Sequence, residues 1–301
     1  MADAPAYTID SFTAGDGYVW RYRRFRAAGA ARGEIVFVHG IQSHGGWYEE
    51  SCAELCHAGF NVSFLDRRGS GLNPGGRGDA PSFRRLVDDI AEYLTSLPRA
   101  VTRDDKVAKL PVLLAAISWG GKLALALERR HPGLVDGLVL LCPGIVPKVR
   151  TPLGRRLLIL LARLFRPRKL FAIPLNDPEL FTATPRWLDF LAADPLRLQH
   201  ATARFLVESV RLDGYLRFVH KYVRAPVLLF LAENDRIIVN AKTRAFVERL
   251  AAKDKQIIEY AGAHHTLEFE EPRRFVHDML TWLEAHVDLN RDPIPPPTKT
   301  P

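Results

Sequence analysis

Short apolar runs alternate with amphipathic stretches through most of this 301-residue chain, and this alternation constrains the fold more than any other feature. A short apolar run followed by helical spacing is typical of a mainly parallel sheet covered by helices. The expected strands are residues 35–38, 62–65, 112–117, 138–141, 227–231 and 256–260. The expected helices are residues 48–58, 83–96, 121–130, 243–252 and 272–286. An α/β fold class follows, with an antiparallel strand pair near residues 7–9 and 18–22.

The alternation is interrupted once, over residues 147–224. This interval has helical spacing, is basic and contains prolines at its start, and shows no strong strand pattern. It is therefore interpreted as a helical cap inserted into the sheet domain. The predicted core comprises residues 1–146 and 225–288, and the proline-rich residues 289–301 are predicted to form a disordered tail.

A single serine follows the central apolar run. Ser118 stands between that run and two glycines, directly before a stretch with good helical spacing. The carboxyl end of a central strand lies at the crevice of an open α/β sheet, where ligands bind. The tight turn requires small residues such as Gly120, and the pattern matches a nucleophile elbow with Ala116 in place of its first glycine. An ordinary strand-to-helix turn is the alternative interpretation.

Acidic residues and histidines follow the last two predicted strands. A serine hydroxyl becomes a good nucleophile when a base removes its proton and a third group orients that base. In an elbow fold the chain order is serine, acid, histidine. Glu233 and Asp235 follow one strand, and His264 and His265 follow the next. Their placement after successive strands favours a triad with Ser118 over turn or surface roles, with two acids and two histidines as candidates.

Acyl transfer also needs two backbone N–H groups that face the oxygen on which negative charge develops. The residue after the nucleophile, Trp119, supplies one of them. The second comes from the loop after an early strand. In the run His39-Gly40-Ile41, the N–H of Ile41 is the candidate.

Five motifs, taken in order, resemble the α/β-hydrolase superfamily. They are the oxyanion loop 39–50, the turn 66–71, the serine elbow, the acidic loop 233–237 and the histidine loop 262–267. Within the superfamily the chain is most similar to the monoacylglycerol lipase and lysophospholipase group, which also contains serine aminopeptidases. The resemblance spans roughly residues 33–285.

The resemblance implies Ser118 as nucleophile, Asp235 as acid and His265 as base. It also implies Ile41 and Trp119 as oxyanion donors. The chain departs from the family pattern at Ala116, at Trp119, where a smaller or more flexible side chain is usual, and in the oxyanion loop at residues 42–43.

His44 matches a second histidine of the oxyanion loop. Two roles stay open for it, contact with the substrate and hydrogen bonding that holds the loop.

The function implied is a serine esterase of the monoacylglycerol lipase or lysophospholipase type, which forms an acyl-enzyme and needs no metal or organic cofactor. One alternative is an aminopeptidase, which needs carboxylates in the cap to hold a substrate amine. The acidic residues that keep this alternative open are Asp177, Glu179, Asp189 and Asp194. An acyltransferase is a further alternative, and a non-catalytic binding module is the least favoured.

The positive charge of the chain is concentrated in the cap. The net charge is +8, and residues 148–169 contain eight basic residues and no acidic one. On a helical projection the arginines share one sector and the leucines the opposite one. The helix either covers the active site with its apolar face or rests on an anionic membrane. Nucleic acid is disfavoured as a partner because the segment lacks interleaved aromatic residues.

The N-terminal residues, the apolar stretches and the cysteines indicate in which cellular compartment the protein is expected. The first residues show no pattern of a secretion signal, and there is no apolar stretch of about 18 residues. Cys52, Cys56 and Cys142 have neither paired nor metal-ligand spacing, so they are expected to be buried thiols in a reducing compartment. A cytoplasmic protein is expected, with peripheral membrane contact as the addition that the basic segment suggests.

Overall fold

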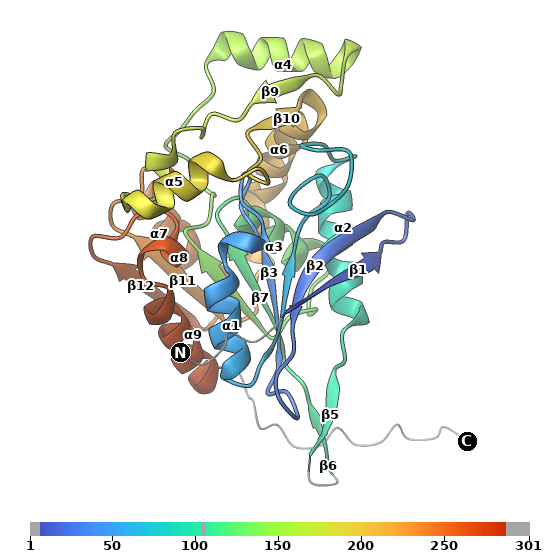
Figure 1. Ribbon diagram of the computed structural model, residues 1–301, viewed down its shortest axis with the longest axis vertical. Helices are drawn as coiled ribbons and strands as arrows, with labels where there is room; N and C mark the ends of the chain where they lie inside the picture. The colour runs from blue at the N-terminus through green and yellow to red at the C-terminus, as the bar shows by residue number, and fades with distance from the viewer. Residues whose placement is uncertain (1–6, 104–105, 287–301) are drawn as a thin grey trace.

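The computed structural model describes residues 7–103 and 106–286, and its centre is an eight-stranded sheet (Figure 1). The strand order is β1-β2-β4-β3-β7-β8-β11-β12. The strands are β1 (Thr8–Thr13), β2 (Val19–Phe25), β3 (Glu34–Val38), β4 (Asn61–Leu65), β7 (Val112–Ile117), β8 (Gly137–Leu141), β11 (Val227–Ala232) and β12 (Lys255–Tyr260). From β4 to β12 all neighbours are parallel, whereas β1–β2 and β2–β4 are antiparallel. The predicted α/β class, its six strands and the antiparallel pair are confirmed.

Helices cover both faces of this sheet (Figure 1). They are α1 (Glu49–His57), α2 (Phe83–Ser96), α3 (Gly120–Arg130), α7 (Asn240–Glu248), α8 (Leu267–Glu270) and α9 (Pro272–His286). α1 packs beside α9, and α2 packs beside α3. Because both faces are covered, strands β3, β7, β8 and β11 are buried along their whole length, which explains their continuous apolar sequences.

Helix α7 differs from its predicted position. It begins three residues earlier and ends four residues earlier than the expected range 243–252. The N–H of Thr243 donates to the carbonyl of Val239, so the helical hydrogen bonds already include the residues before 243. The N–H of Ala251 bonds to the carbonyl of His220 and is therefore no longer part of the helix.

Three features were not predicted because each is short. The hairpin of β5 (Ala100–Arg103) and β6 (Lys106–Lys109) forms a separate two-stranded sheet. Helix α8 is a single turn after the histidine loop. A pair of three-residue strands, β9 (Leu170–Ala172) and β10 (His200–Thr202), lies within the interval that showed no strand pattern.

The segment 147–224, called the cap segment from here on, lies over one end of the sheet (Figure 1). Besides β9 and β10 it contains α4 (Leu153–Phe165), η2 (Pro178–Leu180), α5 (Pro185–Ala193), α6 (Ala203–Tyr215) and η3 (Leu216–Lys221). α6 contacts α2, α3 and α4, so it connects the sheet domain with the outermost helix. The division into core and cap remains a prediction, and the predicted tail 289–301 lies outside the described residues.

Helix α4 turns its apolar side outward. Its leucines and Phe165 are 46–80% exposed, and within this fully described helix Ala162 is the one buried residue. The sector that contains Ile159, Arg155 and Arg163 is half-buried and faces the protein. The interpretation that the apolar face of α4 covers the active site is therefore wrong. Within the described residues, no helix has the length and apolarity to cross a bilayer.

Candidate active site

Ser118 lies in the sharp turn between β7 and α3. Its φ is 50°, in the left-handed region that a residue other than glycine adopts at an energetic cost. The turn brings Gly120 so close to β3 that a Cβ there would lie 2.6 Å from the carbonyl oxygen of Val38. A glycine is therefore required at position 120, as the elbow pattern predicts, and the serine hydroxyl is held at the end of the sheet.

Two other predicted residues are brought to this hydroxyl from the ends of β11 and β12. Nε2 of His265 lies 2.8 Å from Oγ of Ser118, and Nδ1 of the same ring lies 2.6 Å from Oδ2 of Asp235. All three side chains are buried. When Nδ1 carries the proton and donates to the carboxylate, Nε2 can accept the serine proton. The geometry thus allows Ser118 to attack an electrophilic carbon.

The carboxylate of Asp235 is held in its ionised form. Burial alone would raise its pKa, but the charge of His265, the hydrogen bond from the ring and two backbone N–H groups together lower it. The N–H groups of Ile237 and Ile238 donate to Oδ1 at 2.7 and 2.9 Å. An ionised Asp235 can therefore stabilise a protonated His265.

The alternative acid and the alternative histidine lie elsewhere. Oε2 of Glu233 accepts a hydrogen bond from the N–H of Gly262 on the exposed side of the loop. Nδ1 of His264 lies 3.2 Å from Glu270. Among the described residues neither has a hydrogen bond to Ser118 or Asp235, whereas His265 has one to each.

The predicted oxyanion residues flank Ser118. Gly40 passes so close to the serine that a Cβ at position 40 would lie 3.2 Å from the Cβ of Ser118. In the described part of the chain, the backbone N–H groups of Ile41 and Trp119 donate no hydrogen bond. Two unpaired N–H donors beside the serine are what a tetrahedral oxyanion requires.

The peptide that carries the Ile41 N–H is oriented by His39. Nδ1 of this buried ring lies 2.7 Å from the carbonyl oxygen of Gly40, and Nε2 accepts the N–H of Arg67 at 3.0 Å. Burial, reinforced by the charge of Arg67, lowers the pKa of His39 well below its ordinary value. The neutral ring therefore carries its proton on Nδ1 and donates it to Gly40, a role that sequence inspection did not assign to His39.

His44 uses both ring nitrogens within the protein. Nδ1 accepts the N–H of Gly46, and Nε2 lies 2.9 Å from Oδ2 of Asp194 in the cap segment. Nε1 of Trp47 donates to the same carboxylate at 2.7 Å. These bonds favour loop holding over substrate contact for His44. The contact between His44 and Asp194 could not be predicted from local sequence, because the two residues are 150 positions apart.

Cys142, Asp235 and His265 lie close enough to offer a metal three ligand atoms within 4.8 Å of one another. Burial, together with the charge of Asp235, raises the pKa of the Cys142 thiol well above its ordinary value. A neutral thiol is a poor metal ligand, and the other two side chains already bind each other and Ser118. All three cysteines are free and buried, as expected.

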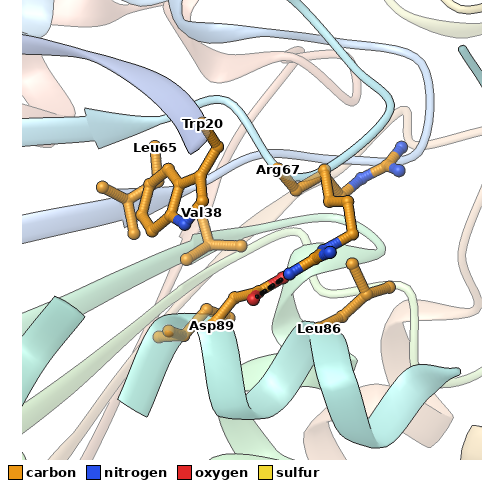
Figure 2. Close-up of a pocket in the computed structure, with 8 residues that line it drawn as sticks. Trp20, Val38, Leu65, Arg67, Leu86 and Asp89 are labelled. Atoms are coloured by element: carbon orange, nitrogen blue, oxygen red, sulfur yellow. Dashed lines mark hydrogen bonds and ion pairs between the residues drawn. The ribbon is translucent and has the colours of Figure 1, made fainter. Parts of the chain in front are cut away.

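A small cavity lies between the sheet and helix α2 (Figure 2). It has a volume of about 10 Å³ and is lined by Trp20, Val38, Leu65, Arg67, Arg68, Leu86, Asp89 and Ile90. This volume suffices for about one water molecule and excludes a substrate. None of Ser118, Asp235 and His265 lines it, and its small volume rules it out as the substrate-binding site.

The chain matches the family described as "Hydrolase_4: Serine aminopeptidase, S33" over residues 29–272. It is 26% identical to the monoacylglycerol lipase of Mycolicibacterium smegmatis over 270 residues, which cover 85% of this chain and 89% of that protein. It is 28% identical to lysophospholipase L2 of Escherichia coli over 286 residues, which cover 86% and 82%. The crystal structure of Paleococcus ferrophilus monoacylglycerol lipase is similar, with a TM-score of 0.76 and 26% identity over 88% of this chain and 98% of that one.

Proposed function

Because this chain belongs to the serine aminopeptidase S33 family of α/β-hydrolases, we propose that it hydrolyses carboxylic esters with Ser118 as its nucleophile. The family membership confirms the resemblance stated for the sequence, and the relatives named as monoacylglycerol lipase and lysophospholipase support an ester-hydrolysing enzyme. The observation that carries the proposal is the continuous line of hydrogen bonds from Asp235 through His265 to Ser118.

The proposed reaction has two halves. Nε2 of His265 removes the proton of Ser118 while Oγ attacks the ester carbonyl carbon, and Asp235 stabilises the imidazolium. The N–H groups of Ile41 and Trp119 donate to the oxyanion. The C–O bond to the alcohol then breaks and His265 gives its proton to the leaving oxygen, which leaves an acyl-enzyme. Water attacks this ester with the same base, and the free acid departs from Ser118.

Lipid monoesters are the proposed substrates. The named relatives act, by their names, on monoacylglycerols and lysophospholipids, and both combine one acyl chain with a polar alcohol. An acyl ester of this kind requires one nucleophile, two oxyanion donors and a proton shuttle, and the proposed site residues fill these roles.

The carboxylates of the cap segment support ester over peptide substrates. Asp194 already binds His44 and Trp47, and the exposed side chains of Asp177 and Glu179 form ion pairs with Arg236. An aminopeptidase would need a carboxylate that is free to bind the substrate amine. Three of the four acidic residues considered for that role have partners within the protein.

We further propose that α4 contacts an anionic membrane. Helix α4 lies at the outer end of the molecule (Figure 1), and its leucines and Phe165 are exposed. Eight basic residues and no acidic one lie in the segment 148–169 around it. An apolar face gains free energy when it enters the headgroup boundary, and each basic residue near an anionic surface adds about 1 kcal/mol. Lipid esters would then reach the enzyme from the surface on which it rests.

Hydrolysis of nitrophenyl esters of increasing acyl length, compared with aminoacyl anilides, tests the reaction. We expect ester turnover without anilide turnover, and loss of nearly all activity in Ser118→Ala with an unchanged melting temperature. Faster cleavage of anilides would assign a peptidase instead. Activity retained in Ser118→Ala would remove this serine from the mechanism, and preferential acyl transfer to an added alcohol would assign a transferase.

Sedimentation with vesicles tests the membrane contact. We expect the protein to sediment with phosphatidylglycerol vesicles more than with phosphatidylcholine vesicles, and less at high salt. Replacing Leu157, Leu164 and Phe165 by serine should abolish sedimentation while hydrolysis of a short soluble ester persists. Val210→Ser, which removes an exposed apolar side chain from α6, is the matched control and should change nothing. Equal sedimentation of the triple variant would contradict the role of α4.

A further inference from the structure

Two consecutive buried arginines follow β4, and they are paired very differently. Both side chains are 6% exposed. Arg68 donates to Asp89 and to Asp16, so its charge has two carboxylate partners. The guanidinium of Arg67 donates to a backbone carbonyl, and among the described residues its Nε and Nη1 have no partner. A buried cation without a partnering carboxylate is costly, which raises the question of what Arg67 does.

Arg67 contacts both predicted oxyanion residues, Ile41 and Trp119. Its Nη2 donates to the carbonyl oxygen of Ile41. Its guanidinium carbon lies 5.2 Å from the ring centre of Trp119 and 5.0 Å from that of Phe205 on α6. The Trp119 ring also packs against Phe205 and donates to Ser209 at 2.9 Å. The ring of the unusual tryptophan after the nucleophile therefore packs in a cluster that contains Arg67.

The backbone of Arg67 also fixes the peptide that precedes Ile41, through His39. Its backbone N–H donates to Nε2 of His39, and Nδ1 of His39 in turn donates to the carbonyl of Gly40. The peptide before Ile41 and the peptide after it are thus both fixed from residue 67, one through His39 and one through the guanidinium. The direction of the Ile41 N–H depends on these two peptides.

We propose that Arg67 is a positioning residue that holds both oxyanion donors, Ile41 through its carbonyl and Trp119 through its ring. The inference rests on the proposed function, because it assigns Arg67 to the oxyanion site of that reaction. Burial lowers the pKa of Arg67 to about 9, partly offset by the charge of Asp66, so the guanidinium remains charged at neutral pH. A charged planar group is suited to both contacts, since it donates in its plane and stacks on aromatic rings.

Steady-state hydrolysis of a short nitrophenyl ester by Arg67→Met tests the inference. Methionine keeps the stem and removes the donors and the charge. We expect kcat to fall about 10- to 100-fold, with KM changed less than about threefold, because oxyanion contacts form mainly in the transition state. The melting temperature should stay unchanged or rise, because an unpaired buried cation is removed. Arg67→Lys, which retains a charge without the planar group, should recover part of kcat.

Arg68→Met is the matched control, since it is adjacent, equally buried and outside the oxyanion contacts. It should lower the melting temperature, because Asp89 and Asp16 lose their partner, and should leave kcat per folded molecule near the wild-type value. A pattern in which Arg67→Met behaves like Arg68→Met would reduce Arg67 to a structural residue and overturn the inference.

A short-chain trifluoromethyl ketone gives a second readout. Ser118 Oγ adds to its carbonyl carbon and the former carbonyl oxygen becomes the oxyanion, while His265 takes the serine proton. The inhibition constant of Arg67→Met should rise by about the same factor by which kcat/KM falls. An unchanged constant would refute the inference and leave the proposed function intact. If the wild-type enzyme neither cleaves the ester nor binds the ketone, the proposed function fails and the inference fails with it.

Discussion

Helices α3 and α4 each follow a parallel strand of the sheet, yet their apolar residues are used in opposite ways. α3 begins at the serine elbow after β7, and all its residues from Gly120 to Glu128 are buried. α4 comes after β8, and its leucines face outward while Arg155 and Arg163 lie on the side toward the protein. An apolar helical face indicates that something must cover it. In α3 the protein itself covers the apolar residues, whereas in α4 they stay exposed, and the proposed cover is an anionic membrane.

The largest expected difference between α3 and α4 is the loss of unfolding free energy when one leucine in each helix is replaced by alanine. Leu125 is fully buried in α3, and Leu164 is 73% exposed in α4. Leu125→Ala should cost about 2–5 kcal/mol of unfolding free energy, because it removes packed methyl groups and leaves a cavity. Leu164→Ala should change it by less than about 0.5 kcal/mol. Urea unfolding measures both, and equal losses would mean that α4 is packed against protein in solution.

The next largest difference is expected when the glycine at the start of each helix, Gly120 or Gly154, is replaced by alanine and ester hydrolysis is measured. A Cβ at Gly120 would lie 2.6 Å from the carbonyl oxygen of Val38 and 2.7 Å from that of His39, whereas a Cβ at Gly154 meets nothing within 4 Å. Gly120→Ala should push the elbow away from the oxyanion loop and lower kcat/KM about 100-fold, which corresponds to about 2.7 kcal/mol. Gly154→Ala should leave the rate of short-ester hydrolysis unchanged. Equal rates for the two variants would show that the elbow tolerates displacement.

A buried acid makes the region of α3 sensitive to pH. Burial raises the pKa of Glu128 to about 7, only partly offset by the N–H groups of Ala225 and Arg224. Between its ordinary value of 4.5 and about 7 the folded chain holds a proton that the unfolded chain releases. The contribution of Glu128 to stability should therefore be complete below about pH 4.5 and fall by about 3 kcal/mol as pH rises through this window.

Glu128→Gln should remove this part of the pH dependence, since a glutamine side chain does not titrate, while Glu268, whose pKa burial raises to about 8, continues to titrate. Unfolding of both proteins in urea at about pH 5 and about pH 7 measures the difference between them. If the wild-type protein and Glu128→Gln show the same pH dependence, another group is responsible for it.

The smallest expected effect is an increase in the free energy of unfolding when a glycine in α4 is replaced. Gly154 lies in the first turn of the helix, is exposed and has open space around it. Replacing it by alanine should stabilise the protein by about 0.5–1 kcal/mol, because glycine loses more backbone entropy in a helix than alanine does. Thermal unfolding with Leu164→Ala as reference measures this gain. A loss would indicate that the first turn of α4 is not helical in solution.

Sequence reasoning predicted contacts that follow from strand order, and the hydrogen bonds of His265 to Ser118 and Asp235 are such contacts, whereas the catalytic roles stay a prediction. Ser118, Asp235 and His265 come after parallel strands, and the carboxyl ends of such strands meet at one edge of the sheet. Periodicity likewise predicted α4 as an amphipathic helix. It could not predict which side faces the protein, because that depends on how α4 lies on α6, and no local pattern encodes this packing. The contacts of His44 with Asp194 and of Arg67 with Trp119 were missed for the same reason, since each joins distant segments.

The two hydrogen bonds of His265 span 147 and 30 positions along the chain. Contacts across such separations form late, because the entropy of closing long loops must be overcome before they are gained. On a ribosome, β12 and the histidine loop emerge only after most of the sheet has been synthesised. A nascent chain should therefore show no ester hydrolysis until strand β12 has paired with β11. During refolding, the rate at which ester hydrolysis returns should equal the rate at which the sheet is completed.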